Sequence, residues 1–281
     1  MTIDEIIVNA LREDIGEGDH TSLSTIPGNA SGKARLLVKE DGILAGVDIA
    51  RKVFSFTDER ITMDQFIPDG ARIKYGDVAF EVTGPSIALL TAERTVLNFM
   101  QRMSGIATQT RLMVDALAGL PTRVLDTRKT TPLLREMEKM AVRIGGGYNH
   151  RIGLYDMILI KDNHVDFAGG IANAITACQH YMHAKGLVLE IEIETRNLEE
   201  VRQVLDYGGV NRIMLDNFSY EMLRQAVTMI DKQYETEASG GITLQTIRNY
   251  AECGVDFISV GSLTHHINSL DLSLKAITQL S

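Results

Sequence analysis

The spacing of apolar residues predicts a small mixed domain in the first part of the chain. An N-terminal helix with one buried face is expected over residues 3–13, because apolar residues recur there every three or four positions until Gly16. Short β-like runs separated by glycines follow, with a helix over 48–56 among them; the runs are 33–38, 43–45, 72–73 and 78–82. This pattern predicts an α+β domain with an antiparallel sheet.

A helical connector follows, with Ser86 as its expected N-cap. Apolar positions continue at helical spacing to about Leu117, and we expect a break or a kink at Ser104-Gly105 before a second helix. The domain boundary is placed along this connector, with an N-terminal domain over 1–108 and a catalytic domain over 109–281.

From residue 123 onward the pattern alternates between strands and helices. The expected strands are 123–125, 156–160, 187–193, 212–215, 235–238 and 257–260. The expected helices are 132–144, 171–185, 198–207, 220–230 and 244–253, and a last helix over about 270–281 could pack on the first domain. Such alternation implies a parallel sheet, and six or seven units fit an incomplete TIM-like α/β barrel. No G-x-G-x-x-G follows an early strand, which argues against a dinucleotide fold.

Nearly every expected strand of this barrel ends in polar or glycine-rich residues. The segments are 126–129, 161–164, 192–195, 216–217, 239–241 and 261–262. In α/β barrels the chemistry lies at the C-terminal ends of the strands. The coincidence predicts an active site at that end.

The distribution of charge indicates an anionic ligand. Residues 123–161 carry eight Lys or Arg against four Asp or Glu, whereas the whole chain has a net charge of −9. A basic segment in an acidic protein favours one anion site over a nucleic-acid surface. No secretory signal or membrane span is expected, and two cysteines fit a cytoplasmic protein with reduced thiols.

Several cationic side chains are candidates for that anion site. Arg128 and Lys129 combine a planar fork with a point charge at a strand end. His150 and Arg151 follow three glycines, which suggest a backbone that approaches a ligand closely. Lys161 follows an apolar strand and could serve as a point charge or as a Schiff-base nucleophile.

Acidic residues and glycine loops complete the expected site. Glu190, Glu192 and Glu194 alternate with isoleucines, so inside a barrel they would point into its interior. With Asp216 they could bind Mg²⁺ or a ribose diol, and the alternation does not say which glutamate does so. Two glycine loops are typical of phosphate sites after late barrel strands; they are Ser239-Gly240-Gly241 and Val260-Gly261-Ser262.

Three motifs carry a resemblance to a known family. They are D-T-R-K-T-T-P at 126–132, G-G-G-Y-N-H-R at 145–151 and L-I-K-D-N-H at 159–164. The sequence closely resembles the quinolinate phosphoribosyltransferases, and the likeness extends in the same order over nearly the whole chain. Two positions depart from the family pattern: Leu133 stands where Gly is expected, and Met140 where Tyr is common.

The resemblance implies an activity and an assembly. Quinolinate and 5-phosphoribosyl 1-pyrophosphate would give nicotinate mononucleotide, pyrophosphate and CO₂ in de novo NAD biosynthesis, with Mg²⁺ as cofactor. It also implies a sandwich-like N-terminal domain and a seven-stranded incomplete barrel. A homodimer is implied in which one subunit's N-terminal domain covers the other's barrel mouth; a hexamer stays open. No nucleic acid or membrane is expected as a partner.

Matched by motif position, the family's roles fall on particular residues. Those implied around quinolinate are Arg94 from the partner subunit, Arg128, His150, Arg151 and Lys161. Those implied around phosphoribosyl pyrophosphate are Lys129, Glu192, Asp216, Ser239, Gly240, Gly241, Val260, Gly261 and Ser262. Glu192 and Asp216 would hold Mg²⁺ directly or through water, and Lys129, Lys161, Glu192 and Asp216 form the implied catalytic set.

Other functions remain as alternatives at this stage. A Schiff-base lyase or aldolase would use Lys161, although carboxylate-binding arginines and phosphate loops fit it less well. A non-catalytic anion or nucleic-acid binder conflicts with the net charge of −9. A related phosphoribosyltransferase or a molybdenum-associated paralogue is nearer, but the N-H-R and K-D-N-H sequences favour quinolinate.

Overall fold

The computed structural model describes residues 1–277 and divides into two compact units. The first contains Met1–Arg111, Thr130–Gly146 and the chain from Thr264 onward, and the second contains Leu112–Lys129 and Gly147–Leu263. The chain therefore passes between the units several times. Within the described residues, no helix combines the length and the apolar composition that crossing a membrane requires.

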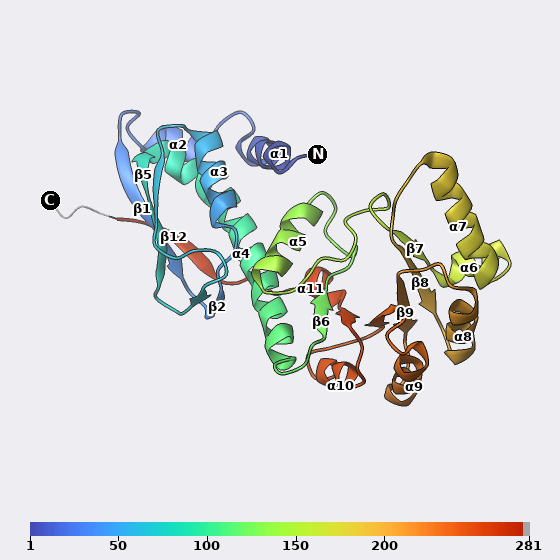
Figure 1. Cartoon of the computed structure of the whole chain (residues 1–281). Coiled ribbons are helices and arrows are strands. Elements are labelled where there is room, and N and C mark those ends of the chain that lie inside the picture. Colours follow the sequence, from blue (N-terminus) through green and yellow to red (C-terminus); the bar gives the residue numbers. More distant parts are fainter. Residues whose placement is uncertain (278–281) are drawn as a thin grey trace. The chain divides into compact units, whose positions relative to one another are not determined.

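The first unit is built on a four-stranded antiparallel sheet with the order β12-β1-β5-β3 (Figure 1). Its strands are β1 (Ser31–Val38), β3 (Thr62–Gln65), β5 (Val78–Pro85) and β12 (Leu272–Ala276), and a separate pair is formed by β2 (Gly42–Ile43) and β4 (Arg72–Ile73). Ala34, Leu36 and Val38 alternate along β1 as buried residues. The expected antiparallel α+β unit is present, and β3 is an addition that the sequence did not predict.

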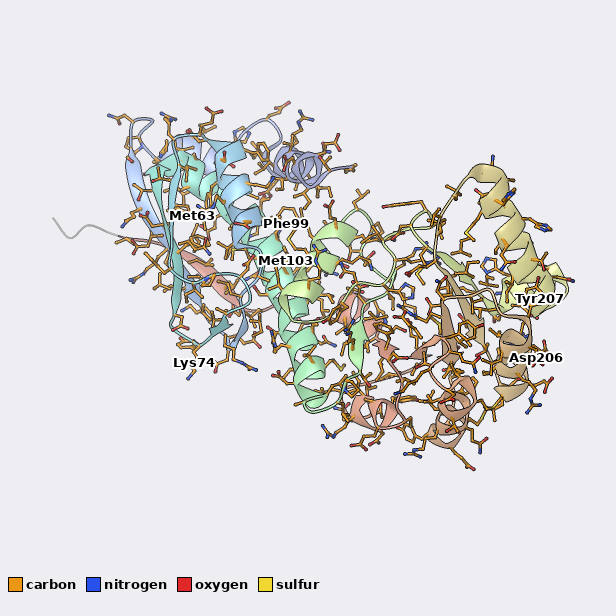
Figure 2. The ribbon with its side chains drawn as sticks, in the orientation of Figure 1. Met63, Lys74, Phe99, Met103, Asp206 and Tyr207 are labelled. Carbon is orange, nitrogen blue, oxygen red and sulfur yellow. The ribbon has the colours of Figure 1, made fainter. Side chains whose placement is uncertain are left out.

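Helices complete the hydrophobic core of this unit. They are α1 (Ile3–Ile15), α2 (His20–Thr25), α3 (Val47–Thr57), α5 (Arg135–Ile144) and most of α4 (Ser86–Ala116). Thr2 and Glu5 cap the start of α1 reciprocally, which satisfies backbone N–H groups that the helix leaves unpaired. Phe99 and Met103 of α4 are almost completely buried (Figure 2).

The expected break in α4 was wrong, because the helix runs through Ser104 and Gly105 without interruption. The hydroxyl of Ser104 donates to the carbonyl of Ala45 and accepts from its N–H. A Cβ atom at Gly105 would lie 2.1 Å from the carbonyl oxygen of Asn268. Because Gly105 has no side chain, another backbone segment can pack closely against the helix at this position.

The expected C-terminal helix over 270–281 was also wrong within the described residues. Residues 272–276 form β12, which pairs antiparallel with β1 from Val38 to Ala34. Leu270, Leu272 and Leu274 are buried in alternation. This period of two is that of a strand with one buried face. The end of the predicted helix, 278–281, lies outside the described residues.

The second unit contains a six-stranded parallel sheet with the order β6-β11-β10-β9-β8-β7. Its strands are β6 (Arg123–Leu125), β7 (Ile158–Ile160), β8 (Ile191–Thr195), β9 (Arg212–Asp216), β10 (Glu235–Ser239) and β11 (Phe257–Ser259). Its helices are α6 (Asp162–Ala168), α7 (Ile171–Lys185), α8 (Leu198–Tyr207), α9 (Tyr220–Ile230) and α10 (Ile247–Ala251), and the short α11 (Ser262–His265) follows β11. Successive helices from α7 to α10 contact one another along one side of the sheet (Figure 1). The parallel α/β barrel class is confirmed.

A seventh strand is present only as a single bridge. Tyr148 pairs in parallel with Leu125 on the free side of β6. The N–H of Tyr148 donates to Val124, and its carbonyl accepts from Asp126. Among residues 1–277 the barrel sheet thus has six strands and one bridge-length extension.

The close approach of the Asn268 carbonyl to Gly105 can be tested by substitution. Replacing a helical glycine by alanine normally favours a helix by about 1 kcal/mol. Here the new Cβ would clash with the Asn268 carbonyl, so we expect Gly105→Ala to destabilise the protein by about 1–3 kcal/mol. Denaturant unfolding should show this loss. Gly28→Ala is the matched control with nothing within 4 Å, and an equal loss there would contradict the explanation.

Leu133 offers a test in the opposite direction. It adopts a left-handed backbone conformation with φ of 68° and is 65% exposed. Such a conformation costs a non-glycine residue about 1–2 kcal/mol. Glycine avoids this strain, but its more flexible unfolded chain offsets part of the gain in stability. We expect Leu133→Gly to raise stability by about 0.5–1 kcal/mol, measured by thermal and denaturant unfolding. Leu133→Ala keeps the strain, and an equal gain from it would refute the backbone account.

Candidate active site

The barrel unit brings polar side chains together at the C-terminal ends of its parallel strands. Asp126 follows β6, Lys161 follows β7, and Asp216 and Ser239 end β9 and β10. The carboxyl ends of parallel strands lie at one edge of a sheet. The residues predicted from strand ends are thereby gathered at one end of the second unit.

Backbone contacts around Asp126 hold His150 in place. Asp126 is fully buried, and its Oδ1 accepts the N–H of His150 at 2.8 Å. The N–H of Arg151 donates to Nδ1 of His150 at 2.7 Å. A ring nitrogen that accepts a hydrogen bond carries no proton, so the proton of the neutral imidazole lies on Nε2.

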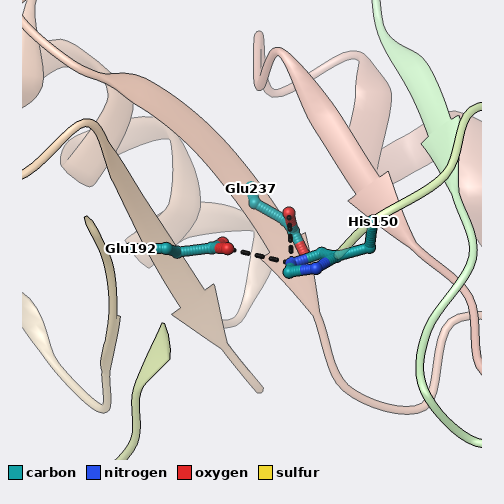
Figure 3. Close-up of side chains that lie close together, drawn as sticks. All are labelled: His150, Glu192 and Glu237. Atoms are coloured by element: carbon teal, nitrogen blue, oxygen red, sulfur yellow. Dashed lines mark ion pairs between the residues drawn. The ribbon is translucent and has the colours of Figure 1, made fainter. Parts of the chain in front are cut away.

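Nε2 of His150 faces two buried acids (Figure 3). It lies 2.9 Å from Oε2 of Glu192 and 3.6 Å from Oε2 of Glu237, and both glutamate side chains are fully buried. His150 extends from the segment beside β6 at one edge of the sheet, whereas Glu192 lies on β8, next to the other edge strand. Their contact requires the sheet to curl around a closed interior, as in a barrel.

Burial changes the protonation of both acids. It raises the pKa of Glu192 to about 7, against the opposing charge of Arg212. Burial, together with the charge of Glu192, raises the pKa of Glu237 to about 8. Two adjacent carboxyl groups without access to water favour retaining a proton, because the charged forms lose hydration and repel each other.

The guanidinium of Arg151 lies near Glu192, and the charge of Arg128 acts on Arg151 in turn. The pKa of Arg151 is lowered by burial and by the positive charge of Arg128. Nη1 of Arg151 donates to the carbonyl of Met157, which fixes the side chain. Neighbouring like charges that are partly removed from water are stabilised by a bound anion, and the planar fork of arginine matches a carboxylate.

Lys161 and Glu194 form a second charged pair at this end. Nζ of Lys161 lies 3.6 Å from Oε2 of Glu194, and the lysine side chain is half exposed. Burial raises the pKa of Glu194, and Lys161 opposes that shift. The loop after β7 is fixed by the N–H of Lys161, which donates to Nδ1 of His164.

The ends of β9 and β10 are locked together. Ser239 Oγ donates to Oδ1 of Asp216 at 2.6 Å, and Asn217 donates to Oδ2 at 2.6 Å. Gly240 has φ of +99°, and a Cβ there would lie 2.1 Å from Oδ1 of Asn217. Glycine is therefore required on both conformational and steric grounds. The helix expected from residue 244 begins at Ile247, so the 239–241 loop does not feed directly into it.

The remaining predicted residues have distinct positions. Lys129 is exposed, and its N–H donates to Oγ1 of Thr127. The N–H of Val260 donates to Leu125, and the 260–262 loop leads into α11. Arg94 lies on α4 in the first unit, so the barrel unit by itself does not include it.

Sequence reasoning missed Glu237, and alternation alone left the three glutamates of residues 190–194 undistinguished, whereas the family resemblance selected Glu192. Glu190 is exposed, Glu192 joins the buried cluster, and Glu194 faces Lys161. The available signal for Glu237 was the alternation of Glu235, Glu237 and Ser239 along β10, the same pattern that drew attention to β8.

Comparisons with known proteins agree with this geometry. The model of the quinolinate phosphoribosyl transferase N-terminal domain matches residues 19–104, and that of the C-terminal domain matches 106–275. The chain is 46% identical to the chloroplastic nicotinate-nucleotide pyrophosphorylase [carboxylating] of Arabidopsis thaliana, over 98% of this chain and 83% of that protein. It is 45% identical to the probable nicotinate-nucleotide pyrophosphorylase [carboxylating] of Bacillus subtilis, over 93% of this chain and 89% of that one.

A solved structure gives the same result. NadC from Streptococcus pyogenes superimposes with a TM-score of 0.94 at 40% identity, covering 99% of this chain and 97% of that one. Both domain models, the relatives and this structure extend over nearly the whole chain. The chain belongs to the quinolinate phosphoribosyl transferase family.

Proposed function

We propose that this protein is a carboxylating nicotinate-nucleotide pyrophosphorylase. It transfers a phosphoribosyl group from phosphoribosyl pyrophosphate to quinolinate and releases pyrophosphate and CO₂, giving nicotinate mononucleotide for NAD biosynthesis. Relatives with this name align over nearly the whole chain at more than 40% identity. The observation that carries the proposal is the placement of Arg151 next to His150 at the barrel's C-terminal end, where the charge of Arg128 also acts on it; two guanidinium groups suit a small dicarboxylate.

The basic residues would bind and orient quinolinate. Arg128 and Arg151 supply two planar forks, and Lys161 supplies a half-exposed ammonium group. The proton on Nε2 of His150 stays directed toward the acids, so the imidazole is a fixed wall of the site. Binding both carboxylates would set the pyridine nitrogen in line with the ribose C1 carbon, and such positioning accelerates bimolecular chemistry.

Phosphoribosyl pyrophosphate would occupy the ends of the later strands. The backbone of Ser239-Gly240-Gly241 and of Val260-Gly261-Ser262 offers close approach to phosphate oxygens. Lys129 is exposed beside the β6 end and would meet the pyrophosphate charge. Asp216 would lie toward the ribose, where its carboxylate favours the developing oxocarbenium character at C1, whereas Glu192 is fully buried against His150 and Glu237.

Magnesium fits one of the two expected carboxylates better than the other. Asp216 is half-buried at a strand end, and both its oxygens already accept hydrogen bonds from neutral groups. Glu192 is fully buried against His150 and Glu237. We therefore assign the contact with Mg²⁺ to Asp216, directly or through water. When bound, Mg²⁺ would neutralise charge on the departing pyrophosphate.

Loss of CO₂ follows from the chemistry of the ring. Once the pyridine nitrogen has bonded to C1, it carries a positive charge beside the 2-carboxylate. The electron pair of the breaking C–C bond then stays on the ring carbon next to that charge, and a proton replaces the carboxylate. The side chains' task is to hold the carboxylate pair and exclude water. This assigns catalysis to positioning and electrostatics, with no side-chain nucleophile.

Assembly as a homodimer is part of the proposal. Arg94 lies on α4 of the first unit, and we propose that it reaches the quinolinate site of a second subunit. Mixing two inactive variants, Arg94→Ala and Lys161→Ala, should then restore part of the activity, because some mixed dimers contain one complete site. Mixtures that stay inactive after subunit exchange would contradict the shared site.

The reaction itself is directly measurable. Purified protein mixed with quinolinate, phosphoribosyl pyrophosphate and Mg²⁺ should produce nicotinate mononucleotide and CO₂ in equal amounts, detected by absorbance and by release of labelled CO₂. Nicotinate in place of quinolinate should give no product, because it lacks the second carboxylate. Removing divalent ions with a chelator should abolish turnover, and magnesium should restore it. Turnover of nicotinate instead would overturn the assignment.

Neighbouring residues should affect different substrates. Arg128→Ala removes a charged fork from the quinolinate site, so we expect its KM for quinolinate to rise roughly 10- to 100-fold. Lys129→Ala should instead raise the KM for phosphoribosyl pyrophosphate. Initial rates with each substrate varied in turn give both constants. If both variants affected the same substrate, the division of the site would be wrong.

A further inference from the structure

Glu237 is a fully buried acid that none of the recognised motifs contains. It lies at the centre of β10, in register with Met214 of β9 and Phe257 of β11. Nη1 of Arg212 lies 3.2 Å from its Oε2. The guanidinium also stacks 4.1 Å from the centre of the Phe257 ring, so the arginine is itself held in position.

The same oxygen that meets the arginine also faces the active site. Oε2 of Glu237 is 3.6 Å from Nε2 of His150, and the His150, Glu192 and Glu237 ligand atoms all lie within 4.8 Å of one another. Oε1 of Glu237 has no hydrogen-bond partner within the described part of the chain. Glu237 therefore links a rigid arginine to the imidazole that stands beside Arg151.

His150 depends on contacts at both ring nitrogens for its orientation. The N–H of Arg151 fixes Nδ1 as the acceptor, and the acids face Nε2, which carries the proton. If the contact with Glu237 is lost, only Glu192 still faces Nε2, and the ring gains freedom to rotate toward that single acid or to change tautomer. The hydrogen bond to the N–H of Arg151 then weakens, and the guanidinium of Arg151 is among the groups assigned to quinolinate.

Three clustered ligand atoms could also hold a metal ion. Arg212 already approaches Oε2 of Glu237, and a guanidinium at that oxygen competes with a cation. The contacts therefore favour a cluster of close ionic contacts around His150, and the metal is kept as an outcome of the test.

We propose that Glu237 is a positioning residue for quinolinate: it holds His150 as the Nε2-protonated tautomer and keeps the ring and Arg151 in their binding orientation. This inference rests on the proposed function for its substrate. It assigns Glu237 no contact with either substrate. The length of its side chain matters, because the carboxyl must span from Arg212 to His150.

Two substitutions distinguish the effect of the length of the Glu237 side chain from the effect of its charge. Glu237→Asp keeps the acid but shortens the side chain by one methylene, so it should lose the His150 contact. Glu237→Gln keeps the length and shape but removes the charge. We expect the aspartate variant to raise the KM for quinolinate roughly 10- to 100-fold, and the glutamine variant to stay within roughly threefold of wild type. Glu235→Asp is the control, because Glu235 binds the same arginine but is 53% exposed; it should match wild type.

A second measurement follows the imidazole itself. The ¹⁵N shifts of the His150 ring nitrogens, assigned against a His150→Gln variant, should report one fixed tautomer in wild type and in Glu237→Gln. In Glu237→Asp they should move toward averaged values. Unfolding temperatures of all variants identify any that are merely unstable, and the glutamine variant keeps the test decisive if the aspartate variant does not fold.

Particular results would contradict either the proposed role of Glu237 or the proposed function. Normal KM and an unchanged tautomer in a folded Glu237→Asp protein would overturn the inference. So would a raised KM in Glu237→Gln equal to that of the aspartate variant. Stoichiometric divalent metal in the purified wild type that is absent from Glu237→Gln would make the cluster a metal site instead. If wild type does not turn over quinolinate, the proposed function fails, while the tautomer measurement still tests the role of Glu237.

Discussion

The buried contact between His150 and the acids Glu192 and Glu237 is the constraint on which the barrel unit depends. It joins a segment at one edge of a six-stranded sheet to a strand near the other edge. Polar groups in an interior without water must satisfy one another or remain costly. The curl of the sheet that brings them together also brings the strand ends around one mouth, where the candidate active site lies.

Charge is layered along this interior. Arg212 lies in register with Glu192 on one side and with Glu235 on the other, so a cation stands among acids at the start of the strands. Two residues after Glu235 along β10, Glu237 contacts both Arg212 and His150. The cations Arg128, Arg151 and Lys161 come from the segments after β6 and β7. Cations near the mouth would attract an anionic substrate to the strand ends, and the His150 imidazole lies against the buried acids Glu192 and Glu237.

Departures from the predicted elements have local physical reasons. Gly105 suggested a helix break, but its missing Cβ makes room for the Asn268 carbonyl within an intact helix. Leu270, Leu272 and Leu274 belong to a strand because β1 provides a free edge with which they pair. Leu133 occupies a left-handed position with its side chain exposed, so the cost of a non-glycine residue there is confined to backbone strain.

The sequence by itself determined the elements whose burial is periodic and the residue types of the site. The helices over 171–185, 198–207 and 220–230 follow directly from apolar spacing, because each has one face against the sheet. The motifs around Arg128, His150 and Lys161 likewise identify the family. Only the tertiary structure decided which acid meets which cation. Alternation places Glu190, Glu192 and Glu194 on one face, but the partners of Glu192 and Glu194 come from β9, the segment beside β6 and the residue after β7, far apart in the chain. Burial and pairing across the barrel depend on the curl of the sheet, which local patterns do not specify, and for that reason Glu237 became visible only in the folded chain.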